Sequence, residues 1–441
     1  MAFGLLGVLA TSSGCEGKVT SGGDSSEGEP RVQLTAGCAV FEGRLKCWGR
    51  NDYGRLGLED TEHRGDQPGE MGDALPEVDL GTGVQVASIA TAAWHSCALL
   101  TDGGVKCWGR NDGGQLGLGD TEDRGDDPGE MGDALPAVDL GSGRMVSRLF
   151  VGAGHSCALF DGGDIKCWGH NTYGQLGLGD GEHRGDDPNE MGDTLAIVDL
   201  GAQSRVINLG LGSGRTCALL TDGRVKCWGA NTVGQLGLGD TEDRGDEPGE
   251  MGDALPSVDL GSSEAVDLIV GAGHACALLA TGRVKCWGAN DSGQLGLGDR
   301  NDRGGSISDM GSALSPVDLG SVEVVGLHGV GNHTCARLSK GRLKCWGTNT
   351  FGALGVGDRW GRGYEPGQMG NALPMVDLGR DAVLTSVSPA AHGFTCALLS
   401  GRTVKCWGRN AYGQLGLGDT EDRGDEPGEM GDVLPFVDLG F

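Results

Sequence analysis

The sequence predicts an all-β protein, a seven-bladed β-propeller built from repeats of about 60 residues with four strands each. Three observations predict it. A tryptophan-centred motif recurs seven times at nearly constant spacing, from Trp48 to Trp407. Fourteen of the 15 cysteines fall into close pairs, one pair in each repeat. The 87 glycines recur at fixed places in the repeat, where turns need them, and not in featureless runs.

The N-terminal stretch is predicted to direct export. Residues 1–15 are a signal-like segment, an apolar run too short to span a bilayer but suited to the core of a secretory signal. The small residues before Cys15 resemble a bacterial lipoprotein cleavage box, and that resemblance implies lipidation of Cys15. A disordered N-terminus with one stray thiol is the alternative. Residues 16–30 are a polar, Gly/Ser-rich flexible linker, and residues 31–441 form the predicted propeller.

The second repeat shows the expected order of elements. An alternating apolar segment at 86–90 predicts a first strand, and a hairpin follows whose three-residue loop, 101–103, ends on a glycine. This loop places Cys97 directly opposite Cys107. The first repeat is one residue shorter, which fits a two-residue turn, and the seventh has an arginine at the third loop position. The apolar segment after the next proline, 136–140, is the expected fourth strand.

The paired cysteines predict disulfides. Directly opposed residues of antiparallel strands have Cα atoms about 4.5–5.5 Å apart, a separation that a disulfide tolerates. The predicted cross-strand bonds are Cys38–Cys47, Cys97–Cys107, Cys157–Cys167, Cys217–Cys227, Cys276–Cys286, Cys335–Cys345 and Cys396–Cys406. The alternative is a set of reduced core thiols that behave as small hydrophobes. Disulfides indicate an oxidising compartment, so we expect an exported protein of the cell envelope or the extracellular space.

Strand alternation sorts the hairpin side chains onto two faces. Cys97 and Leu99 share one face, whereas Ala98 and Trp108 share the other. Both faces are apolar, as a blade packed between two neighbouring blades requires.

The motif WGxNxxGQLGLGD, preceded by GxxHSCAL, resembles the repeats of the regulator of chromosome condensation family over about residues 31–440. The resemblance implies a seven-bladed propeller. It does not determine an activity, because the same fold serves a nucleotide exchange factor, a plant light sensor, a ubiquitin-ligase module and a secreted inhibitor of β-lactamase. The paired cysteines depart from the nuclear members and indicate an exported bacterial relative.

The net charge of −28 disfavours nucleic acid and anionic membranes as partners, so we expect membrane contact only through a lipid at Cys15. No cofactor is expected, and the chain is expected to be a monomer. Calcium at the acidic loops, such as 120–133, is an alternative, but their spacing does not fit an EF-hand, and Arg124 is placed to neutralise part of the charge. The five Arg-Gly-Asp triplets are explained as a duplicated structural loop, not as an adhesion motif.

Histidines recur two residues before a cysteine, at His95, His155, His274 and His333. Arg215, Phe394 and Ala36 take that position in the fourth, seventh and first repeats. A ring of metal ligands would not have such gaps, so we expect hydrogen-bonded structural histidines.

The positions at which the seven copies differ carry the functional prediction. They are expected to lie on loops at one rim of the propeller, and a second asymmetric loop contributes two more aromatic residues. The predicted partner-binding residues are Arg50, Tyr53, Arg110, His170, Tyr173, Phe351, Trp360, Tyr364, Arg409 and Tyr412. That composition is typical of protein-interaction hot spots. Neutral drift at exposed loops is the alternative.

These observations predict a non-catalytic, exported propeller that binds a protein partner or acts as a scaffold. Two other functions stay open. One is inhibition of an extracellular hydrolase. The other is guanine-nucleotide exchange on a small GTPase, which requires a cytosolic chain with free thiols.

Overall fold

A computed structural model describes residues 32–35, 37–202, 204–390 and 392–440. The chain divides into two compact units, Met1–Pro30 and Arg31–Phe441. The signal-like segment 1–15, the lipidation site Cys15 and the linker 16–30 lie outside the described residues and stay predictions. No helix in the described part of the chain combines the length and the apolar character needed to cross a membrane.

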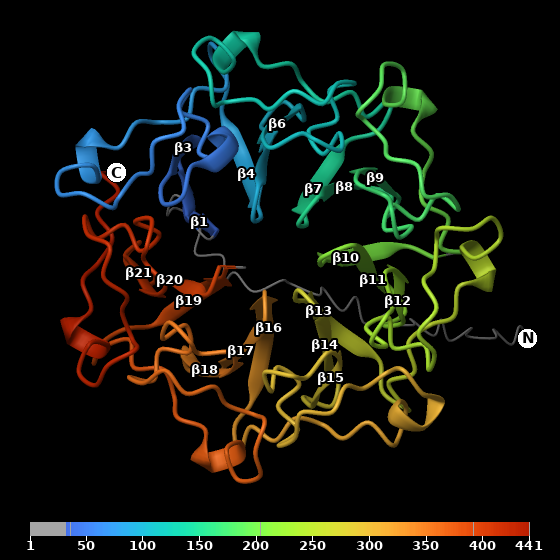
Figure 1. Cartoon of the computed structure of the whole chain (residues 1–441), viewed down its shortest axis with the longest axis vertical. Coiled ribbons are helices and arrows are strands. Elements are labelled where there is room, and N and C mark those ends of the chain that lie inside the picture. Colours follow the sequence, from blue (N-terminus) through green and yellow to red (C-terminus); the bar gives the residue numbers. More distant parts are fainter. Residues whose placement is uncertain (1–31, 36, 203, 391, 441) are drawn as a thin grey trace, which may run out of the picture. The chain divides into compact units, whose positions relative to one another are not determined.

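Each repeat of the second unit folds into a three-stranded antiparallel sheet, or blade, and the seven blades follow one another around a ring (Figure 1). The first strands, nearest the centre, are β1 (Val32–Thr35), β4 (Val86–Thr91), β7 (Val146–Val151), β10 (Val206–Leu211), β13 (Ala265–Val270), β16 (Val324–Val330) and β19 (Leu384–Pro389). The second strands are β2 (Cys38–Phe41), β5 (His95–Leu100), β8 (His155–Phe160), β11 (Arg215–Leu220), β14 (His274–Leu279), β17 (His333–Leu338) and β20 (Phe394–Leu399). The third strands are β3 (Arg44–Cys47), β6 (Val105–Gly109), β9 (Ile165–Gly169), β12 (Val225–Gly229), β15 (Val284–Gly288), β18 (Arg342–Gly347) and β21 (Val404–Gly408).

Short 3₁₀ turns lie in the long connections between blades. They are η1 (Asp52–Gly54), η2 (Gly72–Ala74), η3 (Gly132–Ala134), η4 (Gly192–Thr194), η5 (Gly252–Ala254), η6 (Ile307–Asp309), η7 (Gly370–Ala372) and η8 (Gly431–Val433). The all-β propeller predicted from the repeats is therefore confirmed, with three strands in each blade.

The predicted fourth strand is wrong. The segment 136–140 runs beside β6, and the backbone N–H of Val138 donates to the carbonyl oxygen of Val105 at 2.8 Å, but no strand forms. The proline that opens the segment has no N–H to give to a ladder. At its other end, the Asp139 carboxylate accepts a hydrogen bond from the N–H of Gly141 at 2.9 Å, which turns the backbone away. The segment thus braces the blade without extending its sheet.

The hairpin register follows the sequence prediction. Cys97 lies opposite Cys107 in the ladder of β5 and β6, and the loop between the two strands ends on Gly103 with φ at +90°. In blade 1 the loop is the two-residue turn expected, with positive φ at both Glu42 and Gly43. The loop of blade 7 keeps three residues, and its arginine takes the left-handed conformation that glycine takes elsewhere.

The core is divided into seven apolar clusters, one at each interface between neighbouring blades. At the interface of blades 1 and 2, Cys38 and Cys47 of blade 1 pack in one cluster with Trp108 of blade 2. The same pairing recurs around the ring, so each blade presents its cysteines to the following blade and its tryptophan to the preceding one. These seven tryptophans are at most 2% exposed. The two-faced hairpin predicted from strand alternation is confirmed.

A buried lysine on each third strand ties neighbouring repeats together. These residues are Lys46, Lys106, Lys166, Lys226, Lys285, Lys344 and Lys405. In blade 1, Lys46 Nζ donates to the carbonyl oxygens of Gly72, at 2.9 Å, and of Leu439, at 2.8 Å. The N–H of Gly72 also donates to the carbonyl oxygen of Asp438 at 3.0 Å. The last repeat therefore closes the ring with the same contacts that join the other blades.

Candidate functional site

Two loops of each repeat meet at one end of the ring. One is the turn between the first and second strands, and the other follows the tryptophan. In blade 2 these loops are hydrogen-bonded, from the N–H of Arg110 to the carbonyl oxygen of Trp94 at 3.1 Å. The equivalent bond joins His170 to Gly154 in blade 3. Residues that vary among the repeats therefore lie side by side on this face.

Seven of these residues form one continuous group, which we call the arginine–aromatic cluster. Its members are Arg50, Tyr53, Trp94, Arg110, Phe351, Arg409 and Tyr412. The Arg50 guanidinium carbon lies 5.0 Å from the ring centroid of Trp94 and 5.1 Å from that of Tyr412. The guanidinium carbon of Arg110 lies 5.3 Å from the Tyr53 ring and 5.8 Å from the Trp94 ring. These separations are within cation–π range.

Arg409 extends the cluster across two more blades. Its guanidinium carbon lies 4.9 Å from the ring centroid of Phe351 and 5.7 Å from that of Tyr412. The cluster thus runs from blade 6 through blades 7 and 1 to blade 2. A cavity of about 280 Å³ adjoins it, lined by Phe351, Arg409 and His392 among others.

Carboxylates orient two of the arginines. Arg50 forms an ion pair with Asp52, and Arg110 forms one with Asp112. Both pairs span two residues of the same loop and hold the guanidinium groups against the rings.

Four predicted partner-binding residues lie outside the cation–π contacts of this cluster, and one of them, His170, borders it through Asp112, the ion-pair partner of Arg110. His170 contacts Asp112, 3.4 Å from Nε2 to Oδ1, and stacks edge-on with His183. Tyr173 is 46% exposed on blade 3. Trp360, 72% exposed, and Tyr364, whose ring lies 4.0 Å from the Arg300 guanidinium carbon, belong to the loop after blade 6. The single rim predicted from the sequence is therefore one cluster of six predicted residues, bordered by His170, with Tyr173, Trp360 and Tyr364 outside it.

Sequence reasoning missed Trp94, which stacks at the centre of the cluster. A signal was available in the repeats, because the position before the histidine is glycine in the third, fourth and fifth copies. His392 was missed as well, and its ring lies edge-on to Trp94 with the centroids 5.7 Å apart. Burial lowers the pKa of His392 to about 4, so it is neutral at physiological pH.

A second feature of this face is a cavity of about 270 Å³ in the centre of the ring. It is lined by residues near the ends of all seven first strands, most of them apolar, such as Leu149, Phe150 and Ile269. Arg55 and His392 add charged and polar groups to the lining. The cavity therefore combines an apolar wall with a cation.

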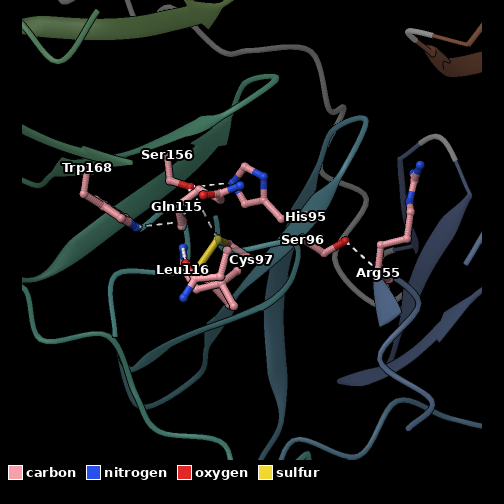
Figure 2. The surroundings of a disulfide bond; sticks show 10 residues. Arg55, His95, Ser96, Cys97, Gln115, Leu116, Ser156 and Trp168 are labelled. Carbon is pink, nitrogen blue, oxygen red and sulfur yellow. Dashed lines mark hydrogen bonds between the residues drawn. A yellow bond between two sulfur atoms is a disulfide. The ribbon is translucent and has the colours of Figure 1, made fainter. Parts of the chain in front are cut away.

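The recurrent histidines form hydrogen bonds across the blade interfaces, as predicted. In Figure 2, His95 Nε2 contacts Ser156 Oγ of the next blade at 2.8 Å, beside the disulfide at Cys97. Ser156 Oγ donates to the carbonyl oxygen of Gln115 at 3.0 Å, and Trp168 Nε1 donates to the same oxygen. Because the hydroxyl hydrogen goes to that carbonyl, the histidine donates from Nε2.

The same unit, which we call the histidine ladder, occurs at four interfaces. Its pairs are His95–Ser156, His155–Thr216, His274–Thr334 and His333–Thr395. At two of the three interfaces without this histidine the hydroxyl is missing as well, since Arg215 is followed one repeat later by Ala275 and Phe394 corresponds to Gly37. At the third, the first repeat carries Ala36, and Ser96 of the next blade donates instead to the carbonyl oxygen of Arg55 at 3.2 Å. Burial lowers the pKa of His95 to about 3, because a second proton on its buried, unpartnered Nδ1 would find no acceptor. The ladder is structural.

Arg215 replaces the ladder with a different set of bonds. Its guanidinium donates to the carbonyl oxygens of Ala272 at 2.7 Å, His274 at 2.8 Å and Gly271 at 3.0 Å. The side chain is fully buried, and burial lowers its pKa to about 9. Arg215 therefore joins blades 4 and 5 through backbone acceptors.

Comparison with known proteins agrees with this architecture. The profile of the regulator of chromosome condensation (RCC1) repeat matches residues 86–115, 146–175, 206–235, 267–294, 330–353 and 392–414. A second RCC1 repeat profile matches residues 42–99, 102–159 and 222–278. The chain belongs to the RCC1 repeat family.

Two curated relatives show how this repeat is distributed. The chain is 31% identical over 391 residues to the ultraviolet-B receptor UVR8 of Arabidopsis thaliana, covering 87% of this chain and 77% of that protein. It is 30% identical over 276 residues to the human probable E3 ubiquitin-protein ligase HERC6, covering 62% of this chain and 24% of that protein. The matched segment thus spans about a quarter of the ligase.

A solved propeller shares the fold. The yeast RCC1 (Prp20) in the crystal structure with Kap60 superposes with a TM-score of 0.64 at 18% sequence identity, over 98% of this chain and 91% of that one. At this identity the likeness shows the fold alone.

The acidic loops of this RCC1-repeat propeller are paired internally, as predicted for Arg124. Arg124 Nη2 lies 2.7 Å from the Asp120 carboxylate, and the corresponding ion pair recurs in all seven repeats. Arg124 also donates to the carbonyl oxygens of Glu122 and Asp123. In the described part of the chain, no three His, Cys, Asp or Glu side chains group as a metal site. Calcium binding stays an untested alternative.

The cysteine pairs of the RCC1 repeats are bonded in the structure. Seven disulfides join the same pairs that the hairpin register indicates, with Cα atoms 4.0–4.1 Å apart. They lie at the blade interfaces against the tryptophans, within the folded core.

Proposed function

We propose that the protein is an exported, non-catalytic propeller that binds a protein partner through the arginine–aromatic cluster. One observation carries the proposal. Seven of the residues that break the repeat symmetry, Trp94 included, come together from four blades into a single contact network, and neutral drift at separate loops would not produce such a network. Trp, Tyr and Arg dominate binding energies at protein interfaces.

The cluster is organised before any partner arrives. Arg50 and Arg110 are held by carboxylates of their own loops and by the rings beside them. Side chains that are already ordered lose little conformational entropy on binding, so more of the contact energy appears as affinity. The adjoining cavity of about 280 Å³, beside Phe351 and Arg409, offers a partner a recess for one anchoring side chain.

The yeast relative supports a binding role in general terms. Its propeller was crystallised with Kap60, a different protein. The proposal for this chain takes from it only that a protein with a propeller of this fold binds another protein.

Export and lipid anchoring are part of the proposal. Seven disulfides favour an oxidising compartment, where such bonds persist, and an apolar N-terminal run precedes Cys15. A lipid on Cys15 would place the propeller at a membrane surface on a flexible linker. Mass spectrometry of the mature N-terminus tests whether Cys15 carries a lipid. We expect a diacylated cysteine as the first residue, which Cys15→Ser abolishes, and an unmodified N-terminus would contradict the anchor.

The binding proposal is tested by comparative capture from envelope extracts of the source organism. The wild-type chain, the double variant Arg50→Ala/Tyr412→Ala and the control Tyr173→Ala are used as baits. Tyr173 is an exposed aromatic residue outside the cluster, so its loss removes similar area without touching the site. We expect the same partner with wild type and control and none with the double variant. Equal capture by all three baits contradicts the proposal, and the partner's own activity then separates inhibition of a hydrolase from scaffolding.

A further inference from the structure

The central cavity of about 270 Å³ has the character of a ligand site beside the arginine–aromatic cluster, and His392 lines both this cavity and the one that adjoins the cluster. Its volume lies near the lower end of the range of about 300–1,000 Å³ that small-molecule sites occupy. The wall is built by the ends of the seven first strands, where apolar residues such as Leu149, Leu209 and Ile269 line the cavity. The wall therefore favours an apolar group of limited size.

The residues that line the wall differ in size around the ring, which leaves space for a ligand on one side. Phe150 and Ile269 lie opposite the first cysteines of their blades, and the corresponding residues of blades 2 and 4 are Ala90 and Gly210. The residue at this register is thus large in blades 3 and 5 and small in blades 2 and 4, whereas blade 6 carries His328. The space next to Ala90 is also the side on which Arg55 lines the cavity.

Arg55 supplies a cation where the repeat pattern has a neutral amide. Five repeats carry glutamine at this position, and blade 6 carries Ala353. Arg55 Nη1 donates to the carbonyl oxygen of Ala93 at 2.6 Å, the one hydrogen bond of this guanidinium among the described residues. No other nitrogen of this guanidinium is both fully buried and without a hydrogen-bond partner, so the remaining N–H groups are accessible from the cavity. No carboxylate forms an ion pair with Arg55 in the described part of the chain.

The charge of Arg55 is unfavourable without an anion. Burial and the charge of Arg50 lower the pKa of Arg55 to about 10, so the guanidinium stays protonated at neutral pH. Asp52 lies in the same loop, but its carboxylate pairs with Arg50. A partly buried guanidinium with unused donors is suited to a carboxylate, which it binds with two parallel hydrogen bonds.

We propose that this end of the central channel binds a small amphipathic anion, an alkyl carboxylate whose tail lies along the apolar wall and whose carboxylate pairs with Arg55. The tail supplies affinity through burial, and Arg55 selects the anion over a neutral or cationic head group. This inference is independent of the proposed protein partner.

Isothermal titration of the full chain tests it, with hexanoate, octanoate and octan-1-ol as probes. We expect saturable binding of octanoate at one site. Each added methylene should tighten binding about fourfold while the cavity has room, because burying a CH₂ is worth a constant increment. Octan-1-ol should bind at least tenfold more weakly than octanoate. Equal affinities for hexanoate and octanoate, or for octanoate and octan-1-ol, overturn the proposal.

Two variants locate the site. Arg55→Gln installs the residue that five other repeats carry, so it preserves the fold, and we expect octanoate affinity to fall at least tenfold while octan-1-ol is unaffected. Ala90→Phe places in blade 2 the side chain that blade 3 carries at the same register, and filling the cavity should abolish binding of both probes. The control Arg283→Gln removes an exposed arginine of a distant hairpin and should change nothing. Unchanged octanoate binding in Arg55→Gln or Ala90→Phe refutes the assignment.

Discussion

The substitution Thr216→Val tests the histidine ladder, which links neighbouring blades at four interfaces. Thr216 Oγ1 contacts His155 Nε2 at 2.9 Å and donates to the carbonyl oxygen of Gln175 at 2.9 Å. Valine keeps the shape and removes both bonds. The Gln175 oxygen keeps a donor, since Trp228 Nε1 lies 3.0 Å away, so that loss costs about 1 kcal/mol.

The larger cost falls on His155, which is fully buried. Its Nε2–H is left without an acceptor, and a buried orphan donor costs about 1–3 kcal/mol. We therefore expect Thr216→Val to lower the free energy of unfolding by about 2–4 kcal/mol in total. Urea unfolding at pH 7.5 with the disulfides intact, followed by tryptophan fluorescence, measures the change.

A double-mutant cycle isolates the bond. The pair His155→Phe/Thr216→Val replaces both partners by apolar groups, as Phe394 and Gly37 already do at the interface of blades 7 and 1. The double variant should be more stable than the sum of the two single losses by about 1–2 kcal/mol. A loss below about 0.5 kcal/mol for Thr216→Val, or strict additivity in the cycle, would refute the reasoning.

Three further predictions follow from the same interfaces. The ladder histidines have depressed pKa values in the folded chain, about 3 to 4, so their contribution to stability is complete above their unfolded pKa of about 6.5 and is lost as the pH falls towards 3. Near pH 5 four such groups lower the free energy of unfolding by about 5 kcal/mol for each pH unit of acidification. Urea midpoints that stay constant between pH 7 and 5 would contradict this prediction. Arg215→His places a histidine without a hydroxyl partner and should cost about 2 kcal/mol, part of which Arg215→His/Ala275→Thr recovers; no recovery would show that the pairing is not local. Thiol titration of the denatured chain should find at most one free thiol before reduction, and several would exclude the seven disulfides.

Most of the fold follows from the repeat pattern because each blade repeats the same physical solution. The cysteine pairs set the hairpin register, and strand alternation places them opposite the next tryptophan, so both were predictable from Cys97, Cys107 and Trp108. The fourth strand was not, since the apolar character of 136–140 indicates burial and not ladder pairing. Its proline and the turn at Asp139 decide the outcome locally.

The candidate site was predictable only in part. Comparing loops identified six cluster residues, because positions that differ among copies of one repeat stand out without any other sequence. It could not tell that Tyr173 lies apart from Tyr412, because that depends on which blades are neighbours of blade 1. Trp94 and Arg55 were missed because they replace glycine and glutamine within otherwise fixed motifs, whereas the prediction rested on the variable loop positions.

The central claim is that the arginine–aromatic cluster binds a protein partner. The most direct measurement is the affinity of the captured partner for Trp94→Ala, since this tryptophan contacts Arg50 and Arg110 at the centre of the cluster. Loss of a hot-spot residue costs about 2 kcal/mol or more, so we expect the Kd to rise about 30-fold or more with an unchanged Tm. A Kd equal to that of wild type would contradict the claim.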